Sequence, residues 1–464
     1  MKRILKEYDL KMAKSNKFKI KKTHNIGSPD AETDDDLFEV FVDIENLELI
    51  LDTKSQKSIL IGRTGSGKSA IIRYLKENCE SIQGINPESM SLRFLSNSTI
   101  LNYFKSLGIN LNLFYKVLWK HVFVVELMKL YFDEADSQKK ASIFQGLIDK
   151  IQGSKVKKTA QKQRVVEYMK NWTDDFWNKT EYRIQKLEKT IQKEFANSMG
   201  MNLEALQLKI SEGSSESEKI LIEAKNKAES IIHATQANEL MDIIEILKED
   251  FFCDHQKKYF IVIDDLDKEW IGDEIRYDLI GSMIEVIKEF RQFKGVKIVI
   301  SLRENLNEMV FSGIKNKGGQ REKFKPMFSN IEWSEEELEI LLDNRLKRLS
   351  ENQLNVKNAF YKSRRGKNTG IDYVLERTFH RPRDIISFVN HALENANNKE
   401  YFTSDILSKA EPSYSLDRFH ALEDEWSENY GRLGKITEFL RGIQNGFKLK
   451  SLNEDQFAEA YVIE

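Results

Sequence analysis

A glycine-rich segment limits most strictly how this chain folds. It reads Gly62-Arg63-Thr64-Gly65-Ser66-Gly67-Lys68-Ser69. An apolar run, Ser58 to Ile61, precedes it, and apolar residues at helical spacing, Ala70 to Leu75, follow it. A short apolar run bounded by turn residues is typical of a buried strand, and glycine permits the positive φ angles of a tight turn. The sequence therefore predicts a strand, a loop and a helix in succession.

The same segment matches the pattern G-x-x-x-x-G-K-[ST], whose residue types suit phosphate binding. Glycines let successive backbone N–H groups converge on phosphate oxygens, and the N-terminus of the following helix adds a positive dipole. Lys68 is placed to pair with the β- and γ-phosphates, and the Ser69 hydroxyl to ligate Mg²⁺. We expect the whole segment, residues 62–69, to hold a nucleotide. A glycine-rich turn that matches by chance is the alternative.

Two further apolar runs predict interior strands of one sheet. They are Tyr259 to Ile263 and Val296 to Leu302, both rich in β-branched residues. Continuous apolar runs of this length are typical of parallel strands that helices cover on both faces. Ser91 to Leu95 and Phe328 to Trp333 are weaker candidates, which bring the expected sheet to about five strands. The prediction is an α/β fold with a parallel sheet.

Acidic residues directly follow the strand predicted at Tyr259 to Ile263. They are Asp264, Asp265 and Asp267. Ligands of open parallel sheets bind at the carboxyl ends of the strands, so these carboxylates are expected to face the glycine-rich loop. Asp264 is the candidate acid on the Mg²⁺ side, acting through water or through the shell that includes Ser69. Asp265 is the candidate that orients the attacking water, a role that Asp267 could share. A helix N-cap cluster is the alternative, and it suits Asp267 best.

Charge and periodicity divide the rest of the chain. A basic block and then an acidic block open it, and such blocks are more often solvated than ligand-binding. Ser334 and Glu337 form the capping-box pattern of a helix start. The predicted parts are a charged N-terminal arm (1–48), the first part of the core (49–98), a helical insertion (99–250), the second part of the core (251–334) and a C-terminal helical lid domain (335–464).

Composition excludes several classes of protein. The 464 residues carry 72 Lys+Arg against 74 Asp+Glu, which argues against a globally basic nucleic-acid binder. The chain has no long uncharged apolar segment, so we expect a cytoplasmic protein without membrane contact. Cys79 and Cys253 lie far apart, with no Cys or His partner at metal spacing, so the sequence signals neither a disulfide nor a zinc site.

These motifs together resemble the additional-strand P-loop ATPases, the AAA+ and STAND groups. The segment Ile263 to Lys268, IDDLDK, most resembles the KAP-like P-loop NTPases, which also carry a long insertion between their two nucleotide motifs. In many of those proteins the insertion holds transmembrane helices, and the insertion at 99–250 is expected to hold none. The resemblance covers the core and the helical region after it. It implies ATP, Mg²⁺ and ATP hydrolysis.

The resemblance implies three further kinds of site residue. Ser301 or Arg303 takes the place of a sensor for the γ-phosphate, and an ordinary strand exit is the alternative. Arg383, in a lid helix whose start Pro382 fixes, takes the place of the second sensor arginine, and a solvated or Asp-paired arginine is the alternative. Many members use an arginine finger from a neighbouring subunit, for which the undistinguished candidates are Arg321, Arg345 and Arg348.

The expected function is a Mg²⁺-dependent, ATP-hydrolysing molecular switch of the STAND type. Such switches often act in bacterial phage defence, and we expect a homo-oligomer and a protein partner or effector. Basic clusters at 155–164 and 362–367 leave nucleic-acid contact open, although solvated loops are the favoured interpretation. A nucleic-acid-stimulated ATPase and a non-hydrolysing nucleotide-binding scaffold are the alternatives.

Overall fold

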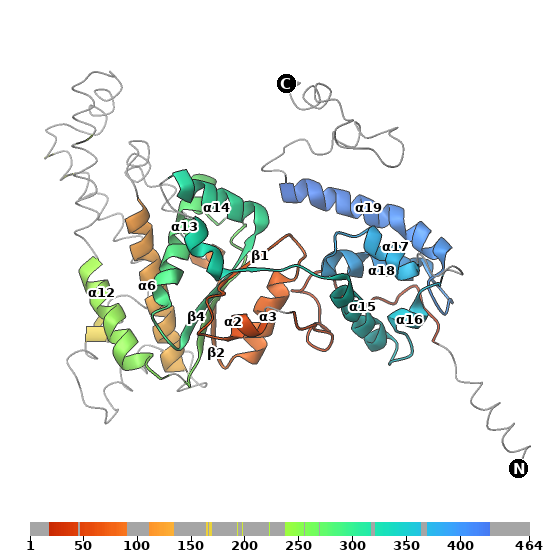
Figure 1. Ribbon diagram of the computed structural model, residues 1–464, viewed down its shortest axis with the longest axis horizontal. Coiled ribbons are helices and arrows are strands. Elements are labelled where there is room, and N and C mark those ends of the chain that lie inside the picture. The colour runs from red at the N-terminus through yellow and green to blue at the C-terminus, as the bar shows by residue number, and fades with distance from the viewer. Residues whose placement is uncertain are drawn as a thin grey trace, which may run out of the picture. The chain divides into compact units, whose positions relative to one another are not determined.

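The computed structural model describes the chain in several stretches and divides it into two compact units (Figure 1). The stretches are residues 18–44, 47–90, 111–133, 237–254, 256–268, 270–316, 321–362 and 369–426, with single helical positions at 164–165, 167–168, 193, 197 and 222. The α/β unit contains Glu45–Arg63 and Lys68–Ile331; the helical unit contains Met1–Ile44, Thr64–Gly67 and Glu332–Glu464.

A five-stranded, all-parallel sheet forms the centre of the α/β unit, which confirms the predicted α/β class. The strands are β1 (Ile59–Gly62), β2 (Ser81–Ile85), β3 (Tyr259–Ile263), β4 (Val296–Arg303) and β5 (Phe328–Asn330). Their order in the sheet is β2-β3-β4-β1-β5. The long apolar runs became β3 and β4, whose side chains are buried almost throughout, as expected for interior parallel strands.

The edge strands differ from the sequence prediction. Residues 91–95, a weaker strand candidate, lie outside the described residues, and the edge strand beside β3 is β2. Its sequence, SIQGI, is partly polar and half-buried, so it gives no apolar signal. At the other edge, β5 is shorter than the predicted Phe328 to Trp333, because the chain turns there into the helix that Ser334 caps.

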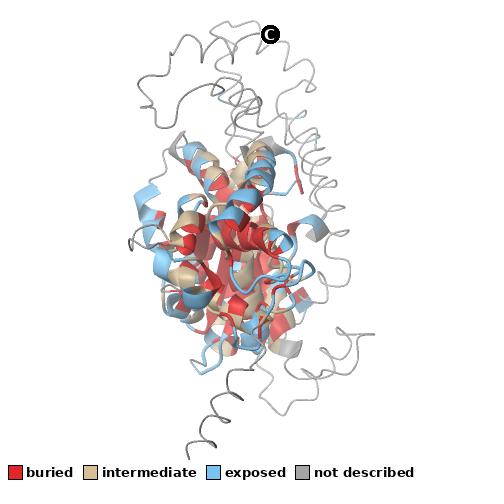
Figure 2. Cartoon of the chain, turned by 90° about the vertical axis from the view of Figure 1, so that its right-hand side faces the viewer, coloured by how far each residue is buried: buried red, intermediate tan, exposed pale blue. Residues whose placement is uncertain are grey.

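Helices and short helical turns surround the sheet in the α/β unit. They are α2 (Leu47–Leu51), α3 (Lys68–Asn78), η1 (Pro87–Met90), α6 (Asn112–Asp133), α12 (Ala237–Ile246), the π-helical turn η2 (Leu247–Phe251), α13 (Asp273–Phe290), α14 (Glu304–Asn316) and η3 (Arg321–Met327). The buried residues of α6 and α12, both from the predicted insertion, share one apolar core with the sheet. Figure 2 shows buried residues in red inside the described part of the chain and exposed residues in pale blue at its surface. Within that core, the Trp119 indole N–H donates to the Leu279 carbonyl at 2.9 Å.

The helical unit consists of a bundle of helices and the segment 18–44. The helices are α15 (Glu335–Leu349), α16 (Val356–Ala359), α17 (Gly370–Glu376), α18 (Pro382–Asn395) and α19 (Ser404–Trp426). The predicted capping box is present at the start of α15, where Ser334 and Glu337 bond to each other's backbone N–H. Pro382 starts α18, where a missing N–H costs no intrahelical bond.

Residues 18–44 belong to the core of the helical unit, so this part of the predicted arm is not a solvated extension. Ile20 and Ile26 are buried in the same apolar cluster as α15 and α18. The Ile20 N–H donates to the Lys399 carbonyl at 2.9 Å. Residues 1–17, which carry most of the basic block, lie outside the described residues.

Acidic residues of the same segment form ion pairs with α15. The Arg345 guanidinium lies 2.6 Å from the Asp34 carboxylate, and the two side chains are only 4% and 2% exposed. Arg348 pairs with Asp36 and Glu39 at the surface. Two of the arginine-finger candidates are therefore engaged within their own chain, and Arg345 is buried there.

None of the described helices combines the length and the apolar character needed to cross a membrane.

We predict that Asp34→Ala lowers the free energy of unfolding by about 3–5 kcal/mol, because it leaves the charge of Arg345 buried without its partner. The matched control is Asp36→Ala, which removes one acid of the surface pairs and is expected to cost less than about 1 kcal/mol. Urea unfolding of both variants measures the difference. Equal losses would contradict the assignment of Asp34 as the buried anchor of this segment.

Candidate functional site

The glycine-rich segment forms the predicted loop between a strand and a helix, from the end of β1 to the start of α3. Gly65 and Gly67 adopt φ angles of +78° and +99°, whereas Ser66 between them stays outside the left-handed region. Alternation of left- and right-handed residues turns successive N–H groups toward one side and forms a concave nest for anions. The positive φ angles of Gly65 and Gly67 are compatible with such a nest.

Lys68 lies at the base of this loop, at the first position of α3. Its ammonium donates to the carbonyls of Gly62 at 2.8 Å and Arg63 at 3.0 Å. Ser69 is the next residue of the helix and is half-buried. The charged ammonium of Lys68 is thus held within the α/β unit, beside the first residues of the loop.

The loop and the acidic residues leave the sheet at the same edge. In the strand register, Gly62 of β1 lies beside Arg303 of β4, and Ile300 of β4 lies beside Ile263 of β3. All these strands are parallel, so the residues that follow them meet at their carboxyl ends. This edge carries the side chains that the sequence singled out after β3 and β4.

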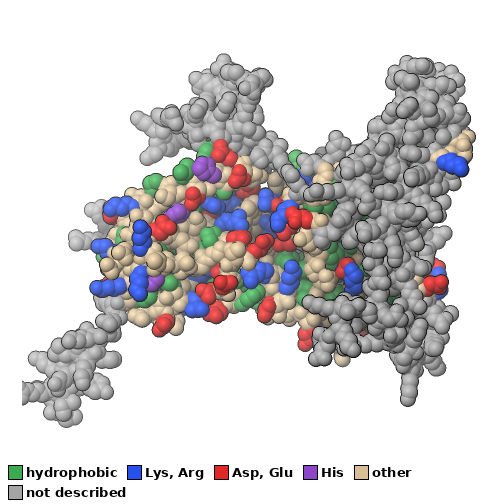
Figure 3. All heavy atoms as spheres, turned by 180° about the vertical axis from the view of Figure 1, so that it is seen from behind, with side chains coloured by type: hydrophobic (Ala, Val, Ile, Leu, Met, Phe, Trp, Pro, Cys, Tyr) green, Lys and Arg blue, Asp and Glu red, His purple; other side chains and the backbone are tan. Residues whose placement is uncertain are grey.

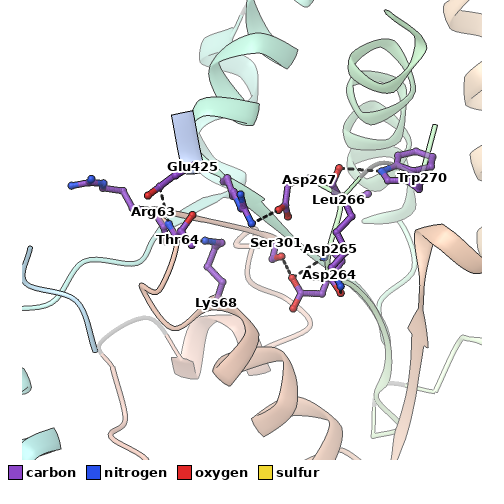
Figure 4. A network of polar contacts seen from close by, with 12 residues as sticks. Arg63, Thr64, Lys68, Asp264, Asp265, Leu266, Asp267, Trp270, Ser301 and Glu425 are labelled. Carbon is purple, nitrogen blue, oxygen red and sulfur yellow. Dashed lines mark hydrogen bonds and ion pairs between the residues drawn. The ribbon is translucent and has the colours of Figure 1, made fainter. Parts of the chain in front are cut away.

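Asp264 and Ser301 contact each other at this edge. The Ser301 hydroxyl donates to Asp264 Oδ1, which also accepts the N–H of Asp265 at 3.0 Å (Figure 4). These two bonds fix the orientation of the Asp264 carboxylate. The structure therefore brings together the predicted Mg²⁺-side acid and one of the two predicted sensor residues.

The other two acids form ion pairs with basic residues. Arg303 lies 2.6 Å from Asp267, and Lys268 lies 3.0 Å from Asp265. Asp265 has a φ angle of +60°, in the left-handed region that non-glycine residues rarely occupy. Backbone strain of this kind is concentrated at functional sites, where surrounding contacts hold the residue in place.

Residues of the helical unit hold the tip of the loop, Thr64–Gly67, which packs as part of that unit. Three consecutive backbone carbonyls of the loop accept hydrogen bonds from the helical unit. Arg381 Nη1 donates to the Thr64 carbonyl at 2.7 Å, and the Arg383 backbone N–H donates to the Gly65 carbonyl at 3.4 Å. Trp333 Nε1 donates to the Ser66 carbonyl at 2.8 Å. The tip is thus fixed by residues far away in the sequence.

A carboxylate also reaches the loop tip. The Thr64 N–H donates to Glu425 Oε1 at 3.2 Å (Figure 4), and Glu425 Oε2 lies 3.6 Å from Arg381 Nη1. Glu425 lies on the last turn of α19, and its side chain is 8% exposed. Its carboxylate is therefore bound by donors that equally suit a phosphate oxygen.

The side chain of Arg381 contacts the loop, and a buried network holds it there. Arg381 Nε donates to Asp384 Oδ2 at 2.7 Å, and Arg418 Nη1 donates to Asp384 Oδ1 at 3.1 Å. Asp384 is fully buried. Burial, with the Asp384 carboxylate as a second cause, raises the pKa of the Tyr414 hydroxyl well above its ordinary value.

The sequence analysis did not predict the contact of Arg381 with the loop, although Arg381 directly precedes the Pro382 that starts α18.

Arg383 approaches the loop through its backbone and the base of its side chain. A Cβ built on Gly65 would lie only 2.6 Å from Arg383 Cβ, so a residue with a side chain does not fit at position 65. The Arg383 guanidinium is 3.5 Å from the Asp30 carboxylate, and its Nε donates to the Pro29 carbonyl at 3.4 Å. Its head group is thus engaged by the segment 18–44, and a sensor role for it stays a prediction.

Basic and acidic side chains are interspersed over the described part of the face that Figure 3 shows. Apart from Arg164 and Lys362, the basic clusters at 155–164 and 362–367 lie outside the described residues. Arg164 pairs with Asp242 at 2.6 Å. The nucleic-acid alternative thus gains no support from this face.

Comparison with known proteins finds a similarity in part of the helical unit. Residues 336–423 match the model of a FunZ-associated C-terminal helical domain. No curated protein matches the chain. The matched stretch includes Arg381, Arg383 and Asp384 of the loop contacts, whereas Trp333 and Glu425 lie just outside its two ends.

We predict that Asp265→Gly leaves the protein more stable than Asp265→Ala by about 1 kcal/mol, because only glycine adopts the left-handed backbone of this position without strain. Both variants remove the carboxylate and its pair with Lys268, so their difference isolates the backbone. Urea unfolding of the two variants measures it. A more stable alanine variant would show that Asp265 is not held in this conformation.

Proposed function

We propose that this chain binds Mg-ATP at the glycine-rich loop, hydrolyses it and acts as a nucleotide-controlled switch. The observation that carries the proposal is the shared edge of the sheet, at which the loop after β1 and the acidic residues after β3 both begin. β4 lies between these two strands, and such an additional strand between the two motifs is what the resemblance to additional-strand P-loop ATPases implies.

The atoms of the loop fit a phosphate group. Positive φ angles at Gly65 and Gly67, on either side of Ser66, suit a nest of N–H groups. The hydroxyls of Thr64 and Ser66 are buried, and among the described residues neither has a hydrogen-bond partner. Buried hydroxyls without partners are rare unless a ligand or water completes them. A nucleotide phosphate supplies the oxygen atoms that these groups lack.

Ser69 and Asp264 are the residues that would hold Mg²⁺. In the described part of the chain, no group of three or more His, Cys, Asp and Glu residues could bind a metal ion. A Mg²⁺ ion at this site therefore needs phosphate and water oxygens as its remaining ligands, which is its usual mode of binding. When bound, Mg²⁺ neutralises charge that develops on the phosphoryl oxygens.

The acidic residues after β3 have different proposed roles in hydrolysis. Hydrolysis consists of attack by water on the γ-phosphorus, with ADP as the leaving group and a proton lost from the water. Asp265 is the candidate that orients this water, because its side chain is more exposed (31%) than that of Asp267 (20%) and because Asp264 is bound to Ser301. The ion pair of Asp265 with Lys268 is partly exposed, so water reaches this carboxylate.

Glu425 supports the switch part of the proposal. Its carboxylate binds the Thr64 N–H and lies beside Arg381, at donors that an incoming phosphate also seeks. Two negative groups cannot share these donors without repulsion. Nucleotide binding would therefore displace Glu425 and release the last turn of α19. That displacement would pass the nucleotide state to the chain beyond this helix and to a partner.

ATP turnover tests the assignment of the site. We predict that Lys68→Ala and Asp265→Asn each lower turnover at least about 100-fold, since the first removes charge stabilisation of the phosphates and the second removes the carboxylate that orients water. Asp265→Asn is expected to bind Mg-ATP with an affinity close to that of the wild type. Lys409→Ala and Asp405→Asn, which break an exposed ion pair on α19, are the controls.

If both site variants hydrolyse ATP at the rate of the wild type, Lys68 and Asp265 do not belong to the hydrolytic site. Tight retention of ATP by the wild type, with no release of phosphate, would favour the scaffold alternative instead.

A second prediction concerns the switch. Glu425→Gln is expected to tighten Mg-ATP binding by about 5- to 20-fold, because it removes the negative charge that competes with phosphate at Thr64 and Arg381. Glu423→Gln removes the same charge from the same helical turn and is the control. Isothermal titration measures both affinities. If the two variants bind Mg-ATP equally well, Glu425 is not a competitor for the site.

A further inference from the structure

At the loop tip, the consecutive carbonyls that face the helical unit determine where the loop N–H groups point. A peptide unit is planar, and its C=O and N–H point in opposite directions. The carbonyls of Thr64, Gly65 and Ser66 are all held by donors of the helical unit. The N–H groups that share their peptide planes, those of Gly65, Ser66 and Gly67, therefore point away from these donors.

Of the three donors, the indole N–H of Trp333 is the one that a side-chain substitution removes with the least effect on other contacts. Its Nε1–H donates to the Ser66 carbonyl at 2.8 Å. A Cβ built on Gly67 would lie 3.7 Å from Trp333 Cζ2, so the ring rests against that glycine at ordinary contact distance. The Trp333 side chain is itself held in place, because it packs on the apolar core of the helical unit and because Trp333 directly precedes the helix cap Ser334.

The other two donors have further attachments. Arg381 also binds Asp384 and lies beside Glu425, so its replacement would disturb a buried network. Arg383 uses its backbone N–H, which no substitution except proline removes. Among the described residues, Trp333 Nε1 has the Ser66 carbonyl as its hydrogen-bond acceptor, and the contact ties the loop to the chain between β5 and α15.

We propose that Trp333 is a positioning residue for phosphate binding: its indole N–H orients the Ser66–Gly67 peptide so that the Gly67 N–H faces the phosphate oxygens. This inference rests on the proposed nucleotide-binding function of the loop. Without the indole N–H, the peptide is free to rotate, and the N–H of a glycine with its wide choice of φ and ψ loses its fixed direction. Preorganised donors bind a charged ligand more tightly than donors that must first be ordered.

The test replaces the donor and keeps the ring. Trp333→Phe is expected to weaken binding of both Mg-ATP and Mg-ADP by about 3- to 10-fold, which is the effect of one hydrogen bond. Trp119→Phe is the matched control, since Trp119 also donates its indole N–H to a backbone carbonyl, that of Leu279. The control is expected to bind both nucleotides with the affinity of the wild type.

A spectroscopic readout separates positioning from a general loss of stability. Tryptophan emission of the wild type is expected to change when Mg-ATP binds, because the phosphate charge alters the field at an indole bonded to the loop. Because Trp426 ends the turn of α19 that nucleotide binding is proposed to release, the measurement is made in a Trp426→Phe background, where Trp119→Phe should keep this change and Trp333→Phe should lose most of it. Thermal melting of each variant checks that the fold persists. If Trp333→Phe does not fold, benzothienylalanine at position 333, in which sulfur replaces the indole N–H, keeps the ring size and tests the same donor.

The outcomes are distinguishable. Wild-type protein that binds neither nucleotide would overturn the proposed function and this inference with it. Wild-type protein that binds Mg-ATP, together with a folded Trp333→Phe variant of equal affinity and unchanged emission response, would overturn the role of Trp333 and leave the proposed function standing.

Discussion

The register of three parallel strands is the constraint on which the rest of the structure depends. β4 aligns Gly62 at the end of β1 with Arg303, and it aligns Ile300 with Ile263 at the end of β3. A shift of one residue in the pairing of β3 with β4 would turn side chains to the opposite face and separate Ser301 from Asp264, and a shift in the pairing of β1 with β4 would move Gly62 away from Arg303. Long apolar runs, buried on both faces, hold that register. The chemistry proposed for the site follows from this alignment.

The glycine-rich loop is divided between the two units. Gly62, Arg63 and Lys68 pack with the sheet, whereas Thr64–Gly67 pack with the helices. Under the proposed function, phosphate binding thus depends on helical residues that orient the loop peptides and on Glu425, which competes at the same donors. In that proposal a ligand bound at the loop would act on α19 through Glu425, and this is the proposed basis of a switch.

Local patterns allowed prediction of the strands β1, β3 and β4, the loop and the capping box, because each depends on neighbouring residues alone. β2 was missed because an edge strand needs no apolar run, and the segment 18–44 was misjudged because scattered apolar residues and one buried ion pair decide its burial. Trp333 and Glu425 were not predicted. Their bonds to the loop join residues 267 and 361 positions apart, and a single sequence carries no signal of such contacts.

The most direct measurement is of the loop amides themselves. In protein labelled with ¹⁵N-glycine, the resonances of Gly65 and Gly67 can be followed during titration with a slowly hydrolysed ATP analogue and Mg²⁺. We predict that both amide protons shift downfield and saturate together, as N–H groups bonded to phosphate do, while the resonance of Gly84 in β2 does not move. Unmoved Gly65 and Gly67 resonances at saturating analogue would contradict it.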